Sequence, residues 1–214
     1  MGMLLSIVLM PLLCADAKYY TLPYHTATIT GKKHRIVWTF DDHPNKTTPK
    51  VLALLKRAKL QATFFVNAYT IANSKKYPYD WKLKRVVGYY KKIKSAGHVL
   101  ANHGHTHRNL CKLSRGRIRW ELTSTQNLVK KLIGVTMKYW RPPHGTVCKK
   151  ANKEAHRLKL KRVMWDIGDY RVSAKTMWRQ LIRRVRRRKK ATVILFHSDT
   201  KKLKTIIGRM KKGR

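Results

Sequence analysis

Short apolar runs alternate along the chain with longer segments in which apolar residues recur every three or four positions. The longer segments are amphipathic, which predicts helices at residues 48–60, 83–95, 117–133, 152–158 and 176–190, followed by a closing helix at the C-terminal end. The apolar runs predict six strands, at residues 35–40, 62–69, 98–103, 137–141, 161–166 and 192–197. Strands that alternate with helices form βα units, so the pattern predicts an α/β fold on a parallel sheet or barrel.

Two stretches interrupt this pattern. Residues 18–34 form a lead-in before the first predicted strand, and a polar, aromatic insert follows the second predicted strand. The helix ends carry local signals, because Thr48 can cap the first helix, Pro49 suits its first position and Gly97 can end the second.

The first 17 residues form an apolar run that is too short to span a membrane and ends in Ala15-Asp16-Ala17. This pattern is typical of a secretory signal peptide with its cleavage site, although Lys and Arg are missing before the apolar run. An N-terminal core strand or a membrane anchor is the alternative. We therefore predict a signal peptide at 1–17, a single domain at 18–214, a secreted, periplasmic or cell-wall location, and no further membrane span.

The net charge of the chain is far more unusual than its length. The chain carries 50 Lys and Arg against 9 Asp and Glu, a formal net charge of +41. This excess predicts attraction to polyanions, which could be an anionic cell-wall polymer or a nucleic acid. The basic run at 183–190 would suit a nucleic acid, yet basic residues are spread over every predicted helix and no recognition motif accompanies them.

The few acidic residues are not spread evenly. Five of the nine lie in three short segments, TFDDHPN, MWDIGDY and FHSD, two of which also contain His. These segments follow predicted strands, where βα folds place their functional sites. The acids therefore indicate a catalytic or metal site at one end of the sheet.

Three histidines in the segment HGHTH leave two geometries open. In an extended segment His103, His105 and His107 would all point to one face. If the segment curls like a helical turn, His103 and His107 converge and His105 points elsewhere. Either arrangement favours a metal site.

The motifs together resemble the NodB-homology polysaccharide deacetylases, carbohydrate esterase family 4. The resemblance rests on TFDDHPNKTTPKVLALLKRAKLQATFFV and on HGHTH, RPPHG, DIGDY and ILFH, which follow in the family's order over roughly residues 35–210. It implies a distorted (β/α) barrel with the site at the C-terminal ends of the strands. Because the sequence stops at KKGR, where the family usually adds a strand, we expect the last strand to be lacking.

The resemblance implies one divalent metal held by Asp42, His103 and His107. The family favours zinc, with cobalt or manganese as alternatives. Two His and one carboxylate also resemble a non-haem iron site, which the ligand types by themselves leave open.

The same resemblance implies the catalytic residues. Asp41 would be the general base, Arg141 would pair with it and hold it ionised, and His197 would be the general acid. Asp169 would orient His197 and raise its pKa. The motif also contains Asp166, for which a structural and a functional role are both open.

Three further residues would contact the substrate. The backbone N–H of His144 would help to bind the oxyanion, and Leu195 would line a pocket for the acetyl methyl group. Tyr170 takes the place of a family Trp. Asp199 is displaced by one position from the family pattern, so its role stays open.

Two residues depart from the family pattern. Gly104 stands where Ser or Thr is usual, which we expect to loosen the loop. His43 stands where Gly is usual, which we expect to narrow the substrate groove or to require a strained turn.

The resemblance therefore implies a metal-dependent hydrolase that removes N-acetyl groups from a polysaccharide containing N-acetylglucosamine. Chitin, peptidoglycan and xylan remain open as substrates. The alternatives are a catalytically weak glycan-binding member of the fold and a basic nucleic-acid-binding protein.

The predicted export would place the cysteines in an oxidising compartment. If Cys14 leaves with the signal peptide, Cys111 and Cys148 remain. Both follow site motifs closely, so we predict a disulfide between them, with two buried free thiols as the alternative.

Overall fold

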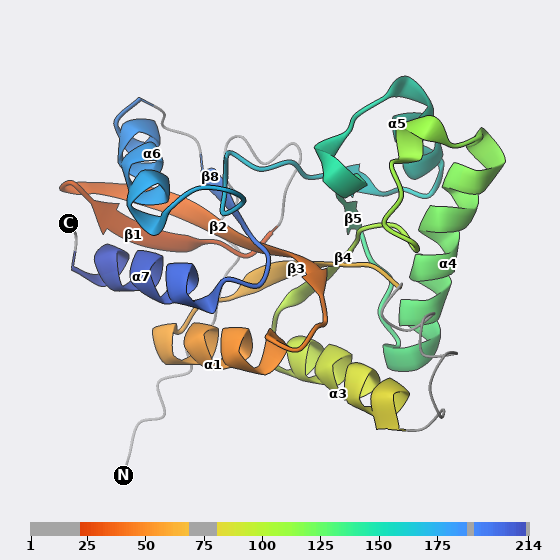
Figure 1. The fold of residues 1–214 in the computed structure, drawn as a ribbon, viewed down its shortest axis with the longest axis horizontal. Helices are drawn as coiled ribbons and strands as arrows, with labels where there is room; N and C mark the ends of the chain where they lie inside the picture. Colours follow the sequence, from red (N-terminus) through yellow and green to blue (C-terminus); the bar gives the residue numbers. More distant parts are fainter. Residues whose placement is uncertain (1–21, 69–80, 188–190, 213–214) are drawn as a thin grey trace, which may run out of the picture.

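A computed structural model describes residues 22–68, 81–187 and 191–212. Eight strands form one curled sheet, in the order β6-β5-β4-β3-β2-β8-β7, with β1 paired to β2 (Figure 1). The strands are β1 (His25–Ile29), β2 (Lys32–His43), β3 (Ala62–Val66), β4 (Val99–Asn102), β5 (Tyr139–Trp140), β6 (Lys161–Arg162), β7 (Ile167–Gly168) and β8 (Thr192–Phe196). All neighbours run parallel except β1 and β2.

In the part of the chain that the structure describes, six α-helices accompany the sheet: α1 (Thr48–Ala58), α3 (Trp81–Ser95), α4 (Arg115–Ile133), α5 (Lys149–Arg157), α6 (Ala174–Arg187) and α7 (Thr200–Lys211). Helices α1, α3 and α7 lie along one side of the sheet, α4 and α5 lie beyond β4 and β5, and α6 flanks the β8 end (Figure 1). Within the described residues β6 and β7 form the two ends of the sheet path, so the barrel is not closed. The predicted α/β class and the distorted, incomplete (β/α) barrel are confirmed.

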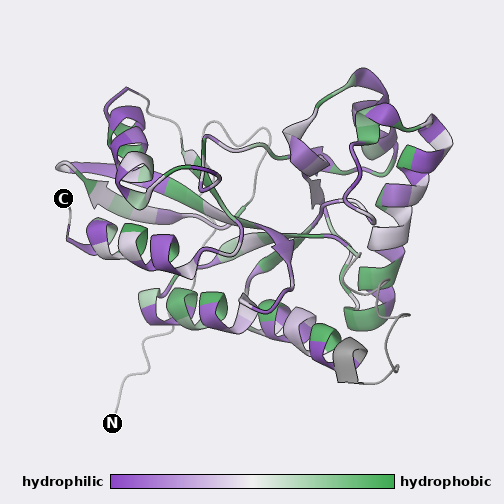
Figure 2. Cartoon of the chain, viewed as in Figure 1, coloured by the Kyte–Doolittle hydropathy of each residue, from purple (hydrophilic) through white to green (hydrophobic). Residues whose placement is uncertain are grey.

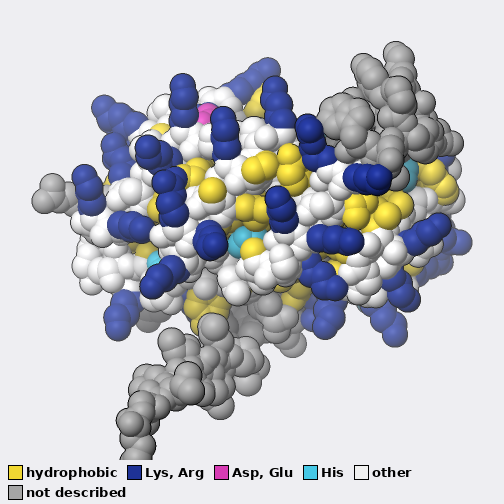
Figure 3. All heavy atoms as spheres, turned by 90° about the horizontal axis from the view of Figure 1, so that it is seen from below, with side chains coloured by type: hydrophobic (Ala, Val, Ile, Leu, Met, Phe, Trp, Pro, Cys, Tyr) yellow, Lys and Arg dark blue, Asp and Glu magenta, His cyan; other side chains and the backbone are white. Residues whose placement is uncertain are grey.

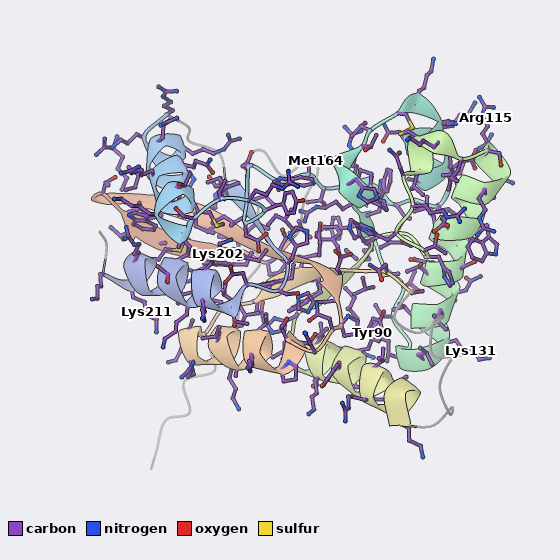
Figure 4. The ribbon with its side chains drawn as sticks, viewed as in Figure 1. Tyr90, Arg115, Lys131, Met164, Lys202 and Lys211 are labelled. Atoms are coloured by element: carbon purple, nitrogen blue, oxygen red, sulfur yellow. A yellow bond between two sulfur atoms is a disulfide. The ribbon has the colours of Figure 1, made fainter. Side chains whose placement is uncertain are left out.

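Aromatic rings fill the space between the sheet and the helices. Phe40 of β2 stacks on Phe64 of β3 and on Phe196 of β8, with ring centres 5.0 and 5.8 Å apart. Tyr90 packs from α3 toward the sheet (Figure 4) and is 1% exposed. Hydrophobic and hydrophilic residues alternate along each helix (Figure 2), as expected for helices that bury one face against a sheet.

The second half of the lead-in forms strand β1, which the sequence pattern did not predict. Thr30 and Gly31 both have positive φ, of 50° and 76°, and join β1 to β2 in a two-residue hairpin. Ala27 and Ile29 of β1 alternate inward with outward-facing threonines, which is the pattern of a half-buried strand.

The predicted strand at 161–166 is also too long. The N–H of Val163 bonds to Trp140 on one side, whereas the N–H of Asp166 bonds to Val193 on the other. The segment therefore crosses from one neighbouring strand to another, and only β6 and the unexpected β7 are regular.

One end of the first predicted helix also shifts. Helix α1 begins at Thr48 and ends at Ala58, so its N-cap is Thr47 and not Thr48 as predicted. The Thr47 N–H donates to the Asn45 side chain, 2.9 Å away.

Basic side chains cover the surface broadly. Figure 3 shows Lys and Arg scattered over the whole visible face, with acidic side chains almost absent from it. None of the helices in the described ranges is long and apolar enough to cross a membrane. The predicted signal peptide at 1–17 and most of the predicted insert after residue 69 lie outside the described residues.

Candidate active site

Most of the predicted site residues line one cleft at the C-terminal ends of the parallel strands, and Asp42, Arg141 and Asp169 contact lining residues from behind. The cleft has a volume of about 970 Å³ and is lined by Asp41, His103, His107, His144, Gly145, Trp165, Asp166, Ile167, Gly168, Tyr170, Val172, Gln180, Arg183, Arg184, Arg187, Leu195 and His197. Strands β2, β4 and β8 deliver Asp41, His103 and His197 at or just past their ends. This arrangement follows from the parallel sheet, because all its strands end at the same edge.

Asp42, His103 and His107 form a compact group of possible metal ligands. One ligand atom of each lies within 4.8 Å of the others. Asp42 Oδ1 is 3.4 Å from His107 Nε2 and 3.9 Å from His103 Nε2. The Asn67 side chain donates to the same oxygen, 2.7 Å away, which fixes the carboxylate.

The loop that carries the histidines is curled. Strand β4 ends at Asn102, and Gly104 and His107 both have positive φ, of 77° and 57°. His105 points away from the cluster, and its ring packs 4.7 Å from the ring of Trp120. The curled alternative is therefore the observed geometry, and Gly104 occupies a backbone conformation that favours glycine.

A buried carboxylate on α4 holds this loop. Glu121 Oε2 accepts hydrogen bonds from the N–H groups of His105 and Thr106, at 2.8 and 2.7 Å. Its other oxygen accepts from the Thr106 hydroxyl at 2.5 Å. We expected Gly104 to loosen the histidine loop, but these hydrogen bonds to Glu121 hold it.

His103 presents Nε2 to the cluster in a defined tautomer. Its Nδ1 lies 2.8 Å from the main-chain carbonyl of Arg141, so Nδ1–H donates and the neutral ring keeps a lone pair on Nε2. Burial lowers the pKa of His103 to about 3, which keeps the ring neutral. Such an outer hydrogen bond is typical of a metal-binding histidine.

Asp41 pairs with Arg141 deep in the sheet. Arg141 Nη1 donates to Asp41 Oδ1 at 2.6 Å, and both side chains are almost fully buried. Burial raises the pKa of Asp41, and the ion pair with Arg141 lowers it by less. The predicted pair of Arg141 and Asp41 is therefore present, and the role of Arg141 in holding Asp41 ionised against the effect of burial stays a prediction.

Arg141 also fills the break between β6 and β7. Its Nε and Nη2 donate to the main-chain carbonyls of Val163 and Met164, at 3.0 and 3.3 Å. Its guanidinium carbon lies 4.0 Å from the centre of the Phe65 ring. One side chain therefore satisfies backbone carbonyls and orients Asp41.

His197 pairs with Asp169 where the neighbouring strands β8 and β7 end. Asp169 Oδ1 lies 2.8 Å from His197 Nδ1, and its Oδ2 accepts from the His197 N–H at 2.9 Å. The hydrogen bond to Asp169 raises the pKa of His197. Lys202, labelled in Figure 4 on α7, donates to the Asp169 carbonyl at 3.0 Å and holds this loop in place.

The three predicted substrate-contacting residues line the cleft. Leu195 is buried, whereas Tyr170 is 68% exposed at the rim. His144 has a left-handed backbone, with φ of 59°. Its Nε2–H donates to the His107 carbonyl at 3.1 Å, which links two loops of the site.

His43 does neither of the things that we expected. Its side chain is fully buried beside the rings of Phe40 and Phe64 and is not among the residues that line the cleft. The positive φ falls on Asp42, at 61°, and not on His43. His43 therefore supports the site from beneath.

Asp166 and Asp199 have structural roles. Asp166 forms an ion pair with Arg184 and accepts from the Val193 N–H at 2.9 Å. Asp199 caps α7 by accepting from the Lys202 N–H at 2.9 Å.

Cys111 and Cys148 form a disulfide, with Cα atoms 5.8 Å apart. The prediction from the sequence is confirmed. The bond joins the short 3-10 helix η2 (Leu110–Lys112) to the residue that precedes α5.

Comparisons with known proteins point to one family. A family model described as polysaccharide deacetylase matches residues 28–163. A peptidoglycan-N-acetylglucosamine deacetylase of Bacillus cereus is 32% identical over 136 residues, which are 63% of this chain and 45% of the relative. The chain thus spans less than half the length of that relative.

Two solved structures share the fold. A family 4 carbohydrate esterase from Streptomyces lividans, in complex with acetate, matches 83% of this chain and 88% of its own, with a TM-score of 0.67 and 23% identity. A family 4 pseudoenzyme from Bacillus anthracis matches 83% of this chain and 60% of its own, with the same TM-score and 23% identity.

Proposed function

We propose that this chain, which belongs to the polysaccharide deacetylase family, is a metal-dependent hydrolase. It would remove N-acetyl groups from a glycan containing N-acetylglucosamine. The observation that carries the proposal is the pairing of Asp41 with Arg141 and of His197 with Asp169 around one group of metal-ligand side chains. Asp41 lies beside a positive charge and His197 beside a negative one. Hydrolysis with a general base and a general acid requires two titratable groups in such different environments.

Asp42, His103 and His107 would hold the metal. Their donor atoms are close together, and the neutral tautomer of His103 directs a lone pair toward the other two. This donor set suits Zn²⁺, with Co²⁺ and Mn²⁺ as alternatives. When bound, the metal supplies Lewis acidity and lowers the pKa of water.

The residues of the chain would move the protons. Asp41 would accept the proton of the attacking water, because Arg141 fixes its orientation and leaves Oδ2 free of that ion pair. His197 would donate a proton to the leaving amine from Nε2, because Nδ1 is held by Asp169. The N–H of His144 would stabilise the oxyanion, and Leu195 would contact the acetyl methyl group.

The substrate and the location are also proposals. The relative from Bacillus cereus acts on peptidoglycan by its name, so we propose a cell-wall glycan, with chitin and xylan as alternatives. The disulfide supports a secreted or cell-wall location, with residues 1–17 as signal peptide and 18–214 as one catalytic domain.

Acetate release tests the proposal directly. The protein would be incubated with acetylated chitooligosaccharide and with peptidoglycan, before and after chelation and after Zn²⁺ is restored. Chelation should abolish release, and Zn²⁺ should restore it. Asp41→Asn should lose about 10²–10⁴-fold in turnover while keeping its metal, because it removes the base and not a ligand.

The metal content of two histidine variants distinguishes the proposed ligand His107 from its neighbour His105. His107→Ala should contain almost no metal, whereas His105→Ala should retain about one ion per chain, because His105 faces Trp120. Loss of the metal in both variants would contradict the ligand set.

The second candidate is a glycan-binding member with little catalysis. The observation in its favour is the structural likeness to a pseudoenzyme of the same fold. Glycan binding without acetate release from any substrate, in the protein loaded with Zn²⁺, would favour this candidate over the hydrolase.

A further inference from the structure

The catalytic cleft extends well past the ligand cluster, onto helix α6. Gln180, Arg183, Arg184 and Arg187 of this helix line the cleft together with the catalytic residues. Their positions are spaced by three, four and seven residues, so they form one face of the helix. Three arginines on one face of a cleft wall are an unusual concentration of positive charge.

The three arginines are not equivalent. Arg184 is paired with Asp166, whose other oxygen accepts from the main chain of β8. This bond anchors the α6 face to the sheet and neutralises one charge. Arg183 and Arg187 are exposed, and neither has an acidic partner within the described part of the chain.

The remaining positive charges favour a negatively charged ligand. Two guanidinium groups on one wall repel each other, and an anion between them removes this repulsion. Guanidinium groups also bind carboxylate and phosphate oxygens through paired hydrogen bonds. The broad positive surface of the protein attracts polyanions in general, but screening limits that effect to about 8 Å at physiological salt.

We infer that Arg183 and Arg187 form an anion-binding subsite, which holds a carboxylate or phosphate group of the glycan while an acetamide lies at Asp41 and His197. This inference rests on the proposed function, because it places the anion on the same substrate. The subsite gives the enzyme a preference for anionic over neutral glycans that is built into the cleft. It identifies the substrate class as an acidic or phosphorylated polymer.

Helix α6 provides a matched control. Arg179 and Arg186 are also exposed on α6 but lie outside the cleft lining. Their spacing of seven residues places both on one face of the helix. The test variant is Arg183→Gln with Arg187→Gln, and the control variant is Arg179→Gln with Arg186→Gln. Both remove two charges from the same helix, and Arg184 remains in place in both.

Three oligosaccharides of equal length serve as probes: a neutral chitooligosaccharide, a peptidoglycan fragment with carboxylates, and a chitooligosaccharide with one phosphate. Dissociation constants and kcat/KM for acetate release are measured for each. The test variant should lose about 10-fold or more in affinity for at least one anionic probe, because each charged hydrogen bond is a substantial contribution. Its affinity for the neutral probe and its unfolding temperature should stay close to those of the unmodified protein.

The control variant decides the interpretation. It should change the affinity for every probe by about 2-fold or less, because screening weakens charges outside the cleft. Equal losses in both variants, or no loss in the test variant, would overturn the subsite. Loss for the carboxylate probe alone or the phosphate probe alone identifies the source of the anion. Binding without acetate release in the unmodified protein would refute the proposed hydrolase and still leave the subsite supported by its affinities.

Discussion

His43 donates a hydrogen bond from Nε2 to the main-chain carbonyl of His197, 2.8 Å away. A carbonyl can only accept, so the proton lies on Nε2 and Nδ1 accepts from the Thr48 hydroxyl, also at 2.8 Å. Burial lowers the pKa of His43, which favours this neutral form. His43 thus connects the start of α1 to the backbone of the proposed acid.

We predict that His43→Phe lowers both stability and turnover. Phenylalanine fills a similar volume but leaves the His197 carbonyl and the Thr48 hydroxyl without this partner, and an unsatisfied buried group costs about 1–3 kcal/mol. Chemical denaturation would measure the free energy of unfolding, and kcat would report the position of His197. His43→Gln, which can keep a donor toward the carbonyl, should recover part of kcat. Unchanged kcat in His43→Phe would show that the contact does not position His197.

Each acidic residue within the described ranges either belongs to the site or makes a structural contact. Asp41, Asp42 and Asp169 belong to the site, Asp166 and Asp199 fix nearby backbone, and Glu121 and Glu154 are fully buried. Glu154 accepts from Arg119 and Arg157 at 3.0 and 2.7 Å, between α4 and α5. The protein therefore keeps carboxylates where they hold structure or chemistry.

Glu121 and Glu154 provide a second matched pair. We predict that Glu121→Gln weakens metal binding by about 10–100-fold, because the amide cannot accept all three hydrogen bonds from the histidine loop. Glu154→Gln should lower stability without this effect, since its partners lie outside the metal-ligand loop. Competition with a chromogenic chelator measures the affinity for Zn²⁺, and thermal unfolding of the metal-free proteins measures stability. Equal metal affinities in the two variants would refute the role of Glu121.

Much of this site could be predicted from the sequence, because apolar strands place the residues that follow them at one edge of a parallel sheet. Asp41, His103, Arg141 and His197 all occupy such positions. Motif order then assigned roles that spacing by itself left open. The same reasoning failed for His43. The backbone turns at Asp42, and this turn decides that the His43 side chain faces the core and not the cleft.

Residues that support the site from other elements were not predicted. Glu121 lies inside α4, and only the packing of that helix brings it against the histidine loop. Asn67 follows β3 and could have been found by the strand-end rule that identified the others. Strand β1 was missed although Gly31 follows an alternating segment, which is a recognisable hairpin signal.

The pH dependence of turnover should report the pair of His197 and Asp169. The hydrogen bond to Asp169 raises the pKa of His197. A general acid must be protonated, so the rate falls as pH rises through this raised pKa. The stability that the pair contributes is fully present below the ordinary His pKa of about 6.5 and is lost as pH rises through the raised value.

We predict that Asp169→Asn moves the alkaline limb of kcat/KM to lower pH, because the amide removes the charge that stabilises the imidazolium. Asp199→Asn is the control, since it removes a negative charge from the loop that carries His197 while asparagine can still cap α7. Profiles measured over the neutral and alkaline range should differ between the two variants. An alkaline limb that stays in place in Asp169→Asn would exclude His197 as the acid.

The disulfide between Cys111 and Cys148 should stabilise the protein without contributing to metal binding. It closes a loop across a sequence separation of 37, for which the chain-entropy account gives a stabilisation of up to about 4 kcal/mol. We predict that Cys111→Ser with Cys148→Ser lowers the free energy of unfolding by a few kcal/mol, measured by denaturant titration. Metal content should remain at about one ion per chain, because Glu121 and Asn67 fix the ligands independently of the disulfide. Reduction of the unmodified protein should reproduce the loss of stability. If two free thiols titrate in the denatured, unreduced protein instead, the bond is not formed and the serine variant should be as stable as the original.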